Sequence, residues 1–414
     1  MSPSDHFSER PVPAETSVCV MGLGYIGLPT ASVLATKGFR VLGVDVRPEV
    51  VNTINRGEIH IEEPDLDILV RSAVNSGQLV AADEPQAADV FMICVPTPIR
   101  EDRSPDLNYV REACAAIRPH VTRGNLVILE STSPPRTTEQ VVAATAIPEN
   151  LKIGEDVFVA HCPERVLPGR ILLEVVQNDR VVGGMTAACS QRAKHFYEAY
   201  VSGEVFATNA LVAEVTKLAE NSYRDVNIAF ANELSMVSDD LGIDPWDVIE
   251  LANRHPRVQI LSPGPGVGGH CISVDPWFLV HAEPERTKLI RTAREVNLSK
   301  PQFIIRHVVQ LAKQFEKPRV GCLGLAYKAD VDDIRESPAV DIVRGLVSED
   351  IGEIMICDPY VRAEQFDALK LYPLSDVLDQ CPLILLLTNH RQFRDIPRRI
   401  LQEKVVVDTR GLYR

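Results

Sequence analysis

One thiol in the sequence lies where it could do covalent chemistry. Cys271 ends the segment PGPGVGGHC (residues 263–271), in which four of nine residues are glycine. Glycine lets a ligand approach the backbone closely, and a cysteine at the junction of a loop and a helix can be activated as a nucleophile. The other eight cysteines mostly lie in apolar runs, which is typical of inert, buried thiols. His270 could act as a base, but a histidine here is more typical of packing or substrate binding.

Four polar residues could assist such a thiol. Lys217 and Asn221 are four residues apart in an expected helix, so both point to one side of it. Asp275 follows the thiol by four residues, and Glu164 lies in the segment CPER. Each is ordinary by itself, because a lysine on an apolar helix is usually a solvated surface residue. Together they suit oxidation past an aldehyde, in which a thiol adds to the aldehyde and water finally releases an acid. A plain alcohol dehydrogenase needs no thiol.

A glycine-rich turn near the N-terminus could bind a dinucleotide. Residues 22–27 read GLGYIG between an expected strand and an expected helix, so backbone N–H groups can face a pyrophosphate. We expect cofactor contacts from Gly22, Gly24, Tyr25, Ile26 and Gly27. Asp45 ends the next strand, where an acid accepts hydrogen bonds from ribose hydroxyls and repels a 2′-phosphate. The pattern favours NAD over NADP, although Arg47 could tolerate a phosphate. The alternative is a turn that binds flavin or nothing.

These residues require a scaffold of parallel strands and helices. Short apolar runs alternate with helical patterns in the first half, which predicts a parallel sheet covered by helices. The expected strands are Ser17–Met21, Arg40–Val44, Asp89–Val95, Asn125–Glu130, Val157–His161 and Arg180–Gly183. The expected helices are Ile26–Lys37, Tyr109–Ile117, Thr137–Ala146 and Thr186–Tyr200. The C-terminal part resumes the alternation, with strands at Arg319–Leu323, Glu353–Cys357, Leu383–Leu387 and Lys404–Val407.

Helices dominate the part of the chain between these two regions of alternating strands and helices. From Ala210 to about Asp240 there is no glycine or proline, and apolar or small residues recur every three or four positions, which predicts one long helix. Further helices are expected at Pro245–Asn253 and about Glu285–Phe315, where Pro301 could break or kink the last one. The fold class is therefore α/β, with two Rossmann-like doubly wound domains joined by a helical domain that has a long central helix. Long helices of this kind often form dimer cores.

Composition limits the partners and the compartment. The chain has 414 residues, 45% hydrophobic and 24% charged, with a formal net charge of −14, so it is an ordinary globular protein that repels polyanions, and no nucleic-acid partner is expected. No apolar run approaches the roughly 18 residues of a membrane span. Residues 1–16 lack the apolar core of a signal peptide and are expected to be a flexible extension. Nine scattered cysteines without a CxxC pair indicate reduced cytoplasmic thiols and no metal site.

Seven motifs, in order along the chain, resemble the UDP-glucose/GDP-mannose dehydrogenase family. They are GLGYIGLPTA (22–31), VPTP (95–98), Ser131-Thr132, CPERVLPG (162–169), KLAENSYR (217–224), GGHC (268–271) and GLAYKADVDDIRESP (324–338). They span nearly the whole chain. Residues 225–233, 252–261 and 263–278 most resemble members that oxidise UDP-N-acetyl-D-mannosamine. Two departures are small: Tyr327 stands where phenylalanine is frequent, and VGCLGL (320–325) lacks the third glycine of a dinucleotide turn, which suits a uridine diphosphate better than a second NAD.

The resemblance implies a role for each residue of the thiol group. Cys271 would carry a thiohemiacetal and then a thioester. Lys217 and Asn221 would position the reacting oxygen and stabilise its negative charge, and Asp275 would order the lysine or a water. Glu164 would assist proton transfer or thioester hydrolysis. The division of acid–base work among the lysine and the two carboxylates stays open.

The resemblance also implies binding residues. Thr132 would hold a water near the thioester and, with Thr97 and Arg335, contact the cofactor. The expected substrate contacts are Glu164, Arg165, Val166, Lys217, Asn221, Arg254, His255, Gly268, Arg257 and Lys328. One of the two arginines Arg254 and Arg257 would reach the substrate of a neighbouring subunit.

The predicted protein is a cytoplasmic homodimer, paired through its helical domain, that binds no membrane. Its domains are an NAD-binding Rossmann domain (17–205), a helical domain (206–316) and a UDP-sugar-binding Rossmann-like domain (317–414). The predicted reaction is the NAD-dependent, four-electron oxidation of UDP-N-acetyl-D-mannosamine to its uronate, for bacterial surface polysaccharide. Within the class, UDP-N-acetylglucosamine and UDP-glucose are alternative substrates. Outside it, a two-electron hydroxyacid dehydrogenase would make one NADH per substrate and need no thiol, and a non-catalytic NAD-binding regulator would turn over no nucleotide sugar.

Overall fold

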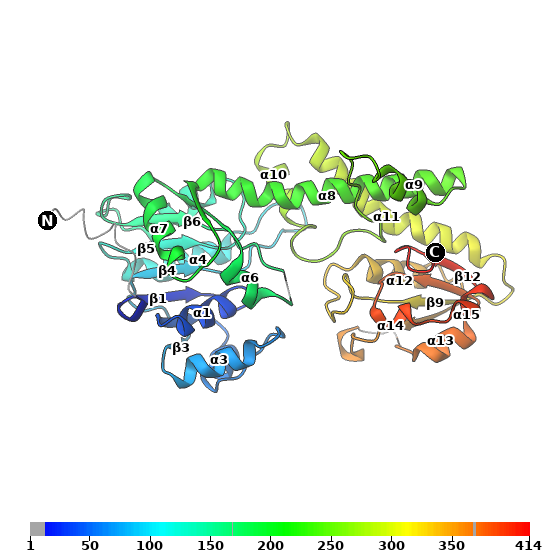
Figure 1. The fold of residues 1–414 in the computed structure, drawn as a ribbon, viewed down its shortest axis with the longest axis horizontal. Coiled ribbons are helices and arrows are strands. Elements are labelled where there is room, and N and C mark those ends of the chain that lie inside the picture. The colour runs from blue at the N-terminus through cyan, green and yellow to red at the C-terminus, as the bar shows by residue number, and fades with distance from the viewer. Residues whose placement is uncertain (1–12, 168, 367–369) are drawn as a thin grey trace. The chain divides into compact units, whose positions relative to one another are not determined.

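The computed structural model describes residues 13–167, 169–366 and 370–414, and these form two compact units (Figure 1). The first unit comprises the described residues up to Ala219 together with Trp277–Ala282. The second comprises Glu220–Pro276 and the described residues from Glu283 to Arg414. Most of the predicted N-terminal extension, residues 1–12, lies outside the described residues; Pro13–Glu15 form a 3₁₀ turn.

The first unit is built on a twisted, mostly parallel sheet. Among the described residues it has eight strands in the order β3-β2-β1-β4-β5-β6-β7-β8, and only β6 and β7 pair antiparallel. The strands are β1 (Ser17–Met21), β2 (Arg40–Val44), β3 (Leu79–Ala82), β4 (Val90–Ile93), β5 (Leu126–Leu129), β6 (Phe158–His161), β7 (Arg180–Gly184) and β8 (Val205–Asn209). The sequence pattern predicted six of them and missed the short strands β3 and β8.

Both faces of the central strands of this sheet are buried, because helices cover each face. On β1, Val18 and Val20 contribute to one hydrophobic core and Cys19 and Met21 to the other, as the two-residue period of a strand requires. The first core is closed by α1 (Gly27–Thr36), α2 (Pro48–Asn55), α3 (Leu66–Asn75), α6 (Ile171–Gln177) and α7 (Ala187–Glu198). The second is closed by α4 (Asn108–Ile117), the π-helical turn Thr138–Ala143 and α5 (Ala144–Ala146). Continuous apolar strands follow from this two-sided burial.

The predicted helix Thr137–Ala146 is a π-helix in its first part. The carboxylate of Glu214 accepts hydrogen bonds from the backbone N–H of Arg136 (2.6 Å) and of Thr138 (2.7 Å). This buried carboxylate takes the place of helical acceptors at the start of the turn.

The second unit contains most of the helical middle. Its helices are most of α8 (Ala210–Leu241), which begins in the first unit, α9 (Pro245–Ala252) and α11 (Lys288–Ala312). Of α10 (Asp275–Ala282), the first two residues belong to the second unit and the rest to the first. The absence of glycine and proline correctly predicted α8. Pro301 does not end α11, which continues for eleven residues beyond it. Pro301 is buried, and its missing N–H frees the carbonyl of Asn297.

The second unit ends in a smaller parallel sheet. Its described strands follow the order β10-β9-β11-β12. They are β9 (Arg319–Leu323), β10 (Glu353–Cys357), β11 (Leu383–Leu386) and β12 (Val405–Asp408). One face packs against α11 and α12 (Pro338–Ser348), and the other against α13 (Leu374–Gln380), α14 (Arg391–Arg394) and α15 (Arg398–Gln402). The structure thus confirms the predicted fold class, with two Rossmann-like sheets and a helical middle.

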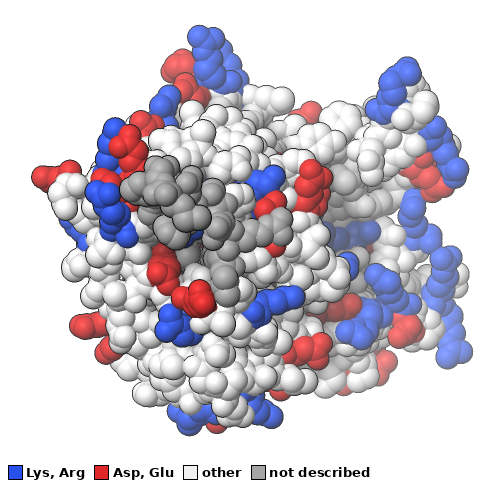
Figure 2. Space-filling model, turned by 60° about the vertical axis from the view of Figure 1, so that its left-hand side comes forward, with Lys and Arg blue, Asp and Glu red and all other residues white. Residues whose placement is uncertain are grey.

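The surface mixes both signs of charge. On the face drawn in Figure 2, acidic and basic side chains are interspersed among uncharged ones. No helix in the described part of the chain has both the length and the apolar character that a membrane crossing needs.

Candidate active site

The glycine turn after β1 leaves room for a dinucleotide. Gly22 has φ +91°, and a Cβ on it would lie 2.7 Å from the carbonyl oxygen of Cys94. A Cβ on Gly27 would lie 1.8 Å from the carbonyl oxygen of Gly22, so only glycine fits at either position. Around Gly24 a Cβ would meet no atom within 4 Å. The first and third glycines therefore close the turn, and the second leaves open space at the N-terminus of α1, where a pyrophosphate fits.

Asp45 stands at the end of β2 with its carboxylate on the same turn. Its Oδ2 accepts a hydrogen bond from the backbone N–H of Leu23 (3.2 Å), and its Oδ1 accepts from Nε of Arg47 (3.1 Å). Burial opposes ionisation, but the bonds from Arg47 and Leu23 outweigh it and hold the pKa of Asp45 below its ordinary value. An ionised carboxylate at this place suits ribose hydroxyls. The guanidinium of Arg47 is bound to Asp45, and this favours NAD over NADP.

The other expected residues of the first unit follow neighbouring strands. Thr97 comes after β4, Thr132 after β5 and Glu164 after β6, so all three lie at the carboxyl edge of the sheet with the glycine turn. The hydroxyl of Thr97 donates to the backbone carbonyl of Thr132 (2.6 Å), which ties the β4 and β5 loops together. Ligands of open α/β sheets bind at this edge, where strand order reverses between β1 and β4. Tyr25, in the turn itself, is exposed.

Glu164 is buried and already has two partners. Its Oε2 accepts from Nη1 of Arg180 (2.7 Å), and its Oε1 accepts from the backbone N–H of Arg165 (2.7 Å). Arg180 is 1% exposed and Glu164 is 7% exposed. Arg165 also donates to the carbonyl of Asp179, while Val166 packs against the hydrophobic core. Of the three expected substrate residues here, Val166 therefore serves packing in this structure.

A second buried carboxylate, which the sequence did not single out, lies beside this pair. Glu130 directly follows β5 and is 1% exposed. Tyr197 donates to its Oε1 (2.7 Å), and the thiol of Cys94 donates to its Oε2 (3.3 Å). Burial and the nearby charge of Glu164 raise the pKa of Glu130 to about 7. In the sequence, the signal that could have identified Glu130 was an acidic residue at the end of an apolar run.

In the second unit, Cys271 is exposed in the turn before α10. Its carbonyl accepts the backbone N–H of Asp275 (2.8 Å), so the thiol precedes the helix by one turn. The buried side chain of Asp275 accepts a hydrogen bond from Nδ2 of Asn221 (2.5 Å). Lys217 lies one helical turn before Asn221 on α8. The expected amide, carboxylate and thiol thus belong to one compact unit, joined through α8 and the start of α10.

The glycines before the thiol pack against a distant part of the chain. A Cβ on Gly268 would lie 2.5 Å from the carbonyl oxygen of Glu336, and one on Gly269 would lie 2.9 Å from the ring of Tyr327. Only glycine allows so close an approach. Tyr327 directly precedes Lys328, whose contact with the substrate stays a prediction.

A buried polar network holds the same segment from the other side. The backbone N–H of Gly264 donates to Oδ1 of Asn232 (2.8 Å), and Nδ2 of Asn232 donates to Oδ1 of Asn297 (2.9 Å). Asn297 and Arg294 both donate to Oδ1 of Asp225 (2.8 and 2.7 Å). All four side chains are at most 2% exposed. Charged residues inside helical patterns were the only sequence signal for this network.

Three expected substrate residues lie in an exposed loop after α9: Arg254, His255 and Arg257. Arg254 pairs with Glu250 on its own helix (3.5 Å), and the backbone N–H of Arg257 donates to His255. This exposure suits a loop that reaches another molecule. Arg335, expected near the pyrophosphate, pairs with Asp333 (2.7 Å). Its contact with the cofactor stays a prediction.

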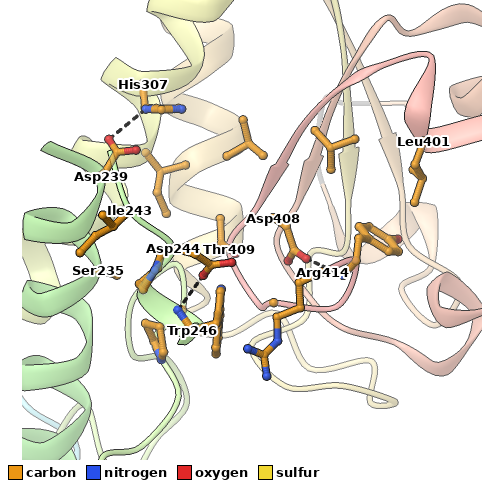
Figure 3. Close-up of a pocket in the computed structure, with 18 of the residues that line it drawn as sticks. Ser235, Asp239, Ile243, Asp244, Trp246, His307, Leu401, Asp408, Thr409 and Arg414 are labelled. Atoms are coloured by element: carbon orange, nitrogen blue, oxygen red, sulfur yellow. Dashed lines mark hydrogen bonds and ion pairs between the residues drawn. The ribbon is translucent and has the colours of Figure 1, made fainter. Parts of the chain in front are cut away.

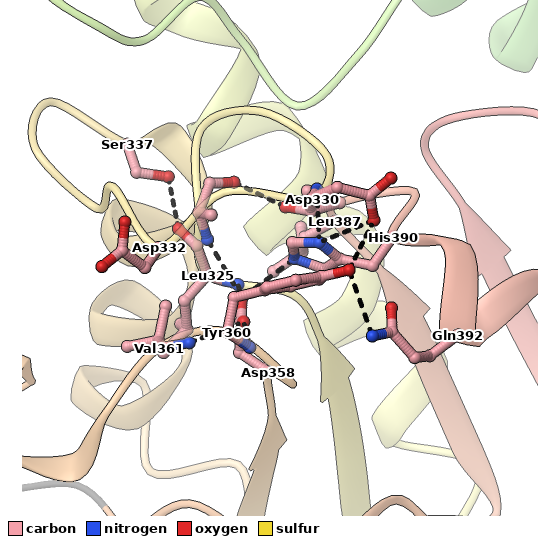
Figure 4. Close-up of polar contacts among 12 residues, drawn as sticks. Leu325, Asp330, Asp332, Ser337, Asp358, Tyr360, Val361, Leu387, His390 and Gln392 are labelled. Atoms are coloured by element: carbon pink, nitrogen blue, oxygen red, sulfur yellow. Dashed lines mark hydrogen bonds and ion pairs between the residues drawn. The ribbon is translucent and has the colours of Figure 1, made fainter. Parts of the chain in front are cut away.

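The second sheet has its own counterpart of the dinucleotide turn (Figure 4). Asp358 follows β10, as Asp45 follows β2, and its Oδ2 accepts the backbone N–H groups of Leu325 (2.7 Å) and Ala326 (3.2 Å). Nδ1 of His390 accepts the N–H of Asp330, so Nε2 carries the hydrogen and donates to Asp358 (3.1 Å). The equivalent bond from Leu23 to Asp45 is also present in the first turn, so the additional bond from Ala326 is what distinguishes the second turn.

The second unit also has a cavity of about 600 Å³, part of which Figure 3 shows. Side chains of α8 and α11, such as Asp239 and His307, face the C-terminal segment that includes Asp408 and Arg414. None of the residues expected to bind substrate or cofactor is among its described lining residues.

Three models of one family match the chain. The NAD binding domain of the UDP-glucose/GDP-mannose dehydrogenase family matches residues 16–201, its central domain residues 211–299 and its UDP binding domain residues 321–414. The chain belongs to this family. It is therefore an NAD-dependent nucleotide-sugar dehydrogenase, and its glycine turn and Asp45 fit that cofactor.

Individual relatives cover nearly the whole chain. An NDP-N-acetyl-D-galactosaminuronic acid dehydrogenase of Ralstonia solanacearum is 50% identical, with 96% of each chain covered. A UDP-N-acetyl-D-mannosamine dehydrogenase of Campylobacter jejuni is 49% identical over 92% of this chain and 96% of its own. The solved UDP-N-acetyl-mannosamine dehydrogenase from S. aureus superposes with a TM-score of 0.88 at 44% identity, covering 96% of this chain and 95% of its own.

Proposed function

We propose that this dehydrogenase oxidises UDP-N-acetyl-D-mannosamine to UDP-N-acetyl-D-mannosaminuronate in two NAD-dependent steps. The observation that carries the proposal is the exposed thiol of Cys271 in one unit with the buried Asn221–Asp275 pair. A thiol is needed only if oxidation continues past the aldehyde. NAD, when bound, accepts one hydride in each oxidation, so one acid requires two NAD.

The protein residues divide the remaining work. Cys271 adds to the aldehyde carbon, and the resulting thiohemiacetal becomes a thioester that water hydrolyses to the acid. Asn221, held by Asp275, and Lys217 on the same helix stabilise the negative charge on the reacting oxygen. Glu164 moves protons during oxidation or hydrolysis. Thr132 and Thr97 hold a water and the cofactor at the sheet edge.

A galactosamine-derived substrate is the second candidate. A relative named for N-acetyl-D-galactosaminuronic acid is as similar to this chain as those named for N-acetyl-D-mannosamine. The two sugars differ in stereochemistry, and no contact among the described residues distinguishes between them. UDP-N-acetylglucosamine and UDP-glucose remain further alternatives from the sequence.

A substrate panel tests these proposals directly. Purified protein and NAD are mixed with each UDP-sugar, and NADH and sugar acid are both quantified. We expect the highest kcat/KM with UDP-N-acetylmannosamine and two NADH per acid. Faster turnover of UDP-N-acetylgalactosamine would replace the first candidate by the second. One NADH per substrate and no acid would instead support a two-electron dehydrogenase.

We further propose a homodimer formed through α8. Four large side chains of this helix, Tyr223, Phe230, Val237 and Leu241, are between 47% and 67% exposed. Their spacing of seven, seven and four residues places them in one stripe, as in helices that pack against another helix. The exposed Arg254–Arg257 loop would then reach the neighbouring subunit's substrate.

Sedimentation velocity tests the dimer. The double variant F230E/V237E should sediment as a monomer and lose most activity, whereas the control Y109E, at an exposed position of α4, should remain a dimer. An unchanged sedimentation coefficient in F230E/V237E would place the interface elsewhere.

The three-domain division at 17–205, 206–316 and 317–414 and a cytoplasmic location are parts of the same proposal. The three matched family domains support the former. The latter is supported by nine free cysteines, none of which forms a disulfide in the structure.

A further inference from the structure

Arg180 is bonded to one buried carboxylate and lies near the tyrosine that binds a second. Its guanidinium carbon is 5.7 Å from the ring centroid of Tyr197, whose hydroxyl donates to Glu130. Its Nη1 donates to Glu164 (2.7 Å) and its Nη2 to the carbonyl of Val175 (2.9 Å), while its buried Nε has no hydrogen-bond partner. Glu130 interacts electrostatically with both Arg180 and Glu164. A buried donor without a partner is costly, so an arrangement in which Nε gained an acceptor would be favoured.

The charge balance of this cluster depends on one proton. If Glu130 is ionised, two carboxylates share one guanidinium and the buried cluster carries a net negative charge. If Glu130 is protonated, the cluster is neutral and Arg180 can serve Glu164 alone. Two like charges at one buried site raise the proton affinity of one of them.

The remaining titratable groups around Glu130 stay neutral near pH 7. They are Cys94 after β4, Cys162 after β6, Tyr197 in α7 and Tyr200 just after α7. Burial raises the pKa of Cys162 to about 12, and burial raises those of Cys94, Tyr197 and Tyr200 well above their ordinary values. Glu130 is therefore the group whose proton sets the charge balance with Glu164 and Arg180.

We propose that Glu130 is a positioning residue whose proton decides whether Arg180 is held by Glu164 alone or is shared. Protonated Glu130 leaves Glu164 locked to Arg180. When Glu130 loses its proton, Arg180 turns toward it and Glu164 is released to accept a proton during catalysis. This inference rests on the proposed function in one respect, which is the role of Glu164. It adds that the protonation state of Glu130 controls this role.

The pH dependence of kcat tests the switch. In the wild type, kcat should rise as pH increases through about 7, where the pKa of Glu130 lies. E130Q cannot ionise, so the rise between pH 6 and 8 should disappear and kcat at pH 8 should fall about tenfold with KM values little changed. Y197F removes a hydrogen bond that favours the ionised form, so its rise should move up by about one pH unit.

A matched control separates the switch from a merely structural effect. E214Q alters another buried carboxylate of the same unit, which binds the π-helical turn, and should keep the wild-type profile. A rise that persists unchanged in E130Q, or a Y197F profile that matches the wild type, would overturn the proposal.

Thermal unfolding gives a readout that needs no turnover. The raised pKa of Glu130 contributes stability that is fully present below its unfolded value near 4.5 and is lost as pH rises through about 7. E130Q lacks this loss. The Tm of E130Q minus the Tm of the wild type should therefore be roughly 5 °C higher at pH 8 than at pH 5. A pH-independent Tm difference would refute buried titration of Glu130. If no nucleotide sugar is oxidised, the proposed function fails while this measurement still decides the inference.

Discussion

The amide of Asn221 and the carboxylate of Asp275 meet across 2.5 Å in the buried part of the candidate active site. The bond joins α8 to the first residue of α10, one turn after the thiol. Because an amide donates and a carboxylate accepts, each side chain fixes the orientation of the other.

Exchanging the two groups tests this bond. N221D alone places two carboxylates face to face, and like charges at this distance should lower kcat by about 100-fold. The double variant N221D/D275N restores one amide and one carboxylate and should recover part of the loss. Steady-state kinetics of the single and double variants measure the coupling. A double variant with losses that simply add would show that the two side chains act independently.

The nucleophile has its own test. C271S should bind NAD and nucleotide sugar but release no acid and make at most one NADH per sugar, because the hydroxyl is a much weaker nucleophile than a thiolate. C114A, at a buried cysteine of α4, should keep two NADH per acid. NADH stoichiometry and chromatography of the sugar products provide the measurement. Full acid production by C271S would refute the thioester route.

The glycine turn predicts a contrast between two alanine variants. G27A forces a Cβ to 1.8 Å from the carbonyl oxygen of Gly22 and should unfold the turn, lowering both stability and NAD binding. G24A meets no protein atom within 4 Å, so its fold should be unchanged while NAD affinity falls about tenfold. Circular dichroism and NAD titration separate the two effects. Normal NAD binding by G24A would mean that the pyrophosphate lies elsewhere.

The buried ion pair of the second unit should be essential to stability. D225N leaves the charge of Arg294 uncompensated in the interior and should cost about 3–5 kcal/mol. D239N, on the same helix, breaks a half-exposed contact with His307 and should cost less than about 1 kcal/mol. Chemical denaturation of both variants provides the comparison. Equal losses would argue against a special role for the network that holds the thiol segment.

Lys300 should make stability depend on alkaline pH. It is 6% exposed and donates to Ser235 (2.6 Å), and burial lowers its pKa to about 8. Between pH 8 and its ordinary value of 10.5 the unfolded state binds more protons, so stability should rise with pH in this window. K300M removes the buried charge and should stabilise the protein at pH 7 by about 1–3 kcal/mol and flatten the rise.

The exposed lysine at the start of α11 provides the control for this effect. K288M should leave both the stability and its pH dependence near those of the wild type. A destabilised K300M at pH 7 would show that the contacts of the ammonium outweigh its desolvation.

Local rules predicted the glycine turn and the long helix. The turn at residues 22–27 and Asp45 follow from a motif whose glycines are required by short-range sterics. The length of α8 follows from a run without helix breakers. Cys271 stood out because its neighbours are small and polar, and it is the cysteine that the structure leaves exposed.

The features that were missed depend on pairs far apart in sequence. Arg180 lies in an apolar strand, and its partner Glu164 is sixteen residues earlier, beyond α6. Asp225 meets Arg294 only when α8 and α11 pack together. A charged residue in an apolar pattern can indicate that a partner exists, but only the packing identifies it. The strands β3 and β8 were missed because they are the edge strands of the first sheet and partly exposed, so they do not stand out as buried apolar runs.

The glycine turn at residues 22–27 has a consequence for the order of events in each catalytic cycle. It lies in the segment that matches the family's NAD binding domain, residues 16–201, whereas residues 321–414 match its UDP binding domain, and the product requires two oxidations. Reduced nucleotide must leave and fresh nucleotide must enter while the half-oxidised sugar stays behind. Retention of the aldehyde is thus as much a task of this protein as its oxidation, and a covalent bond to Cys271 would accomplish it.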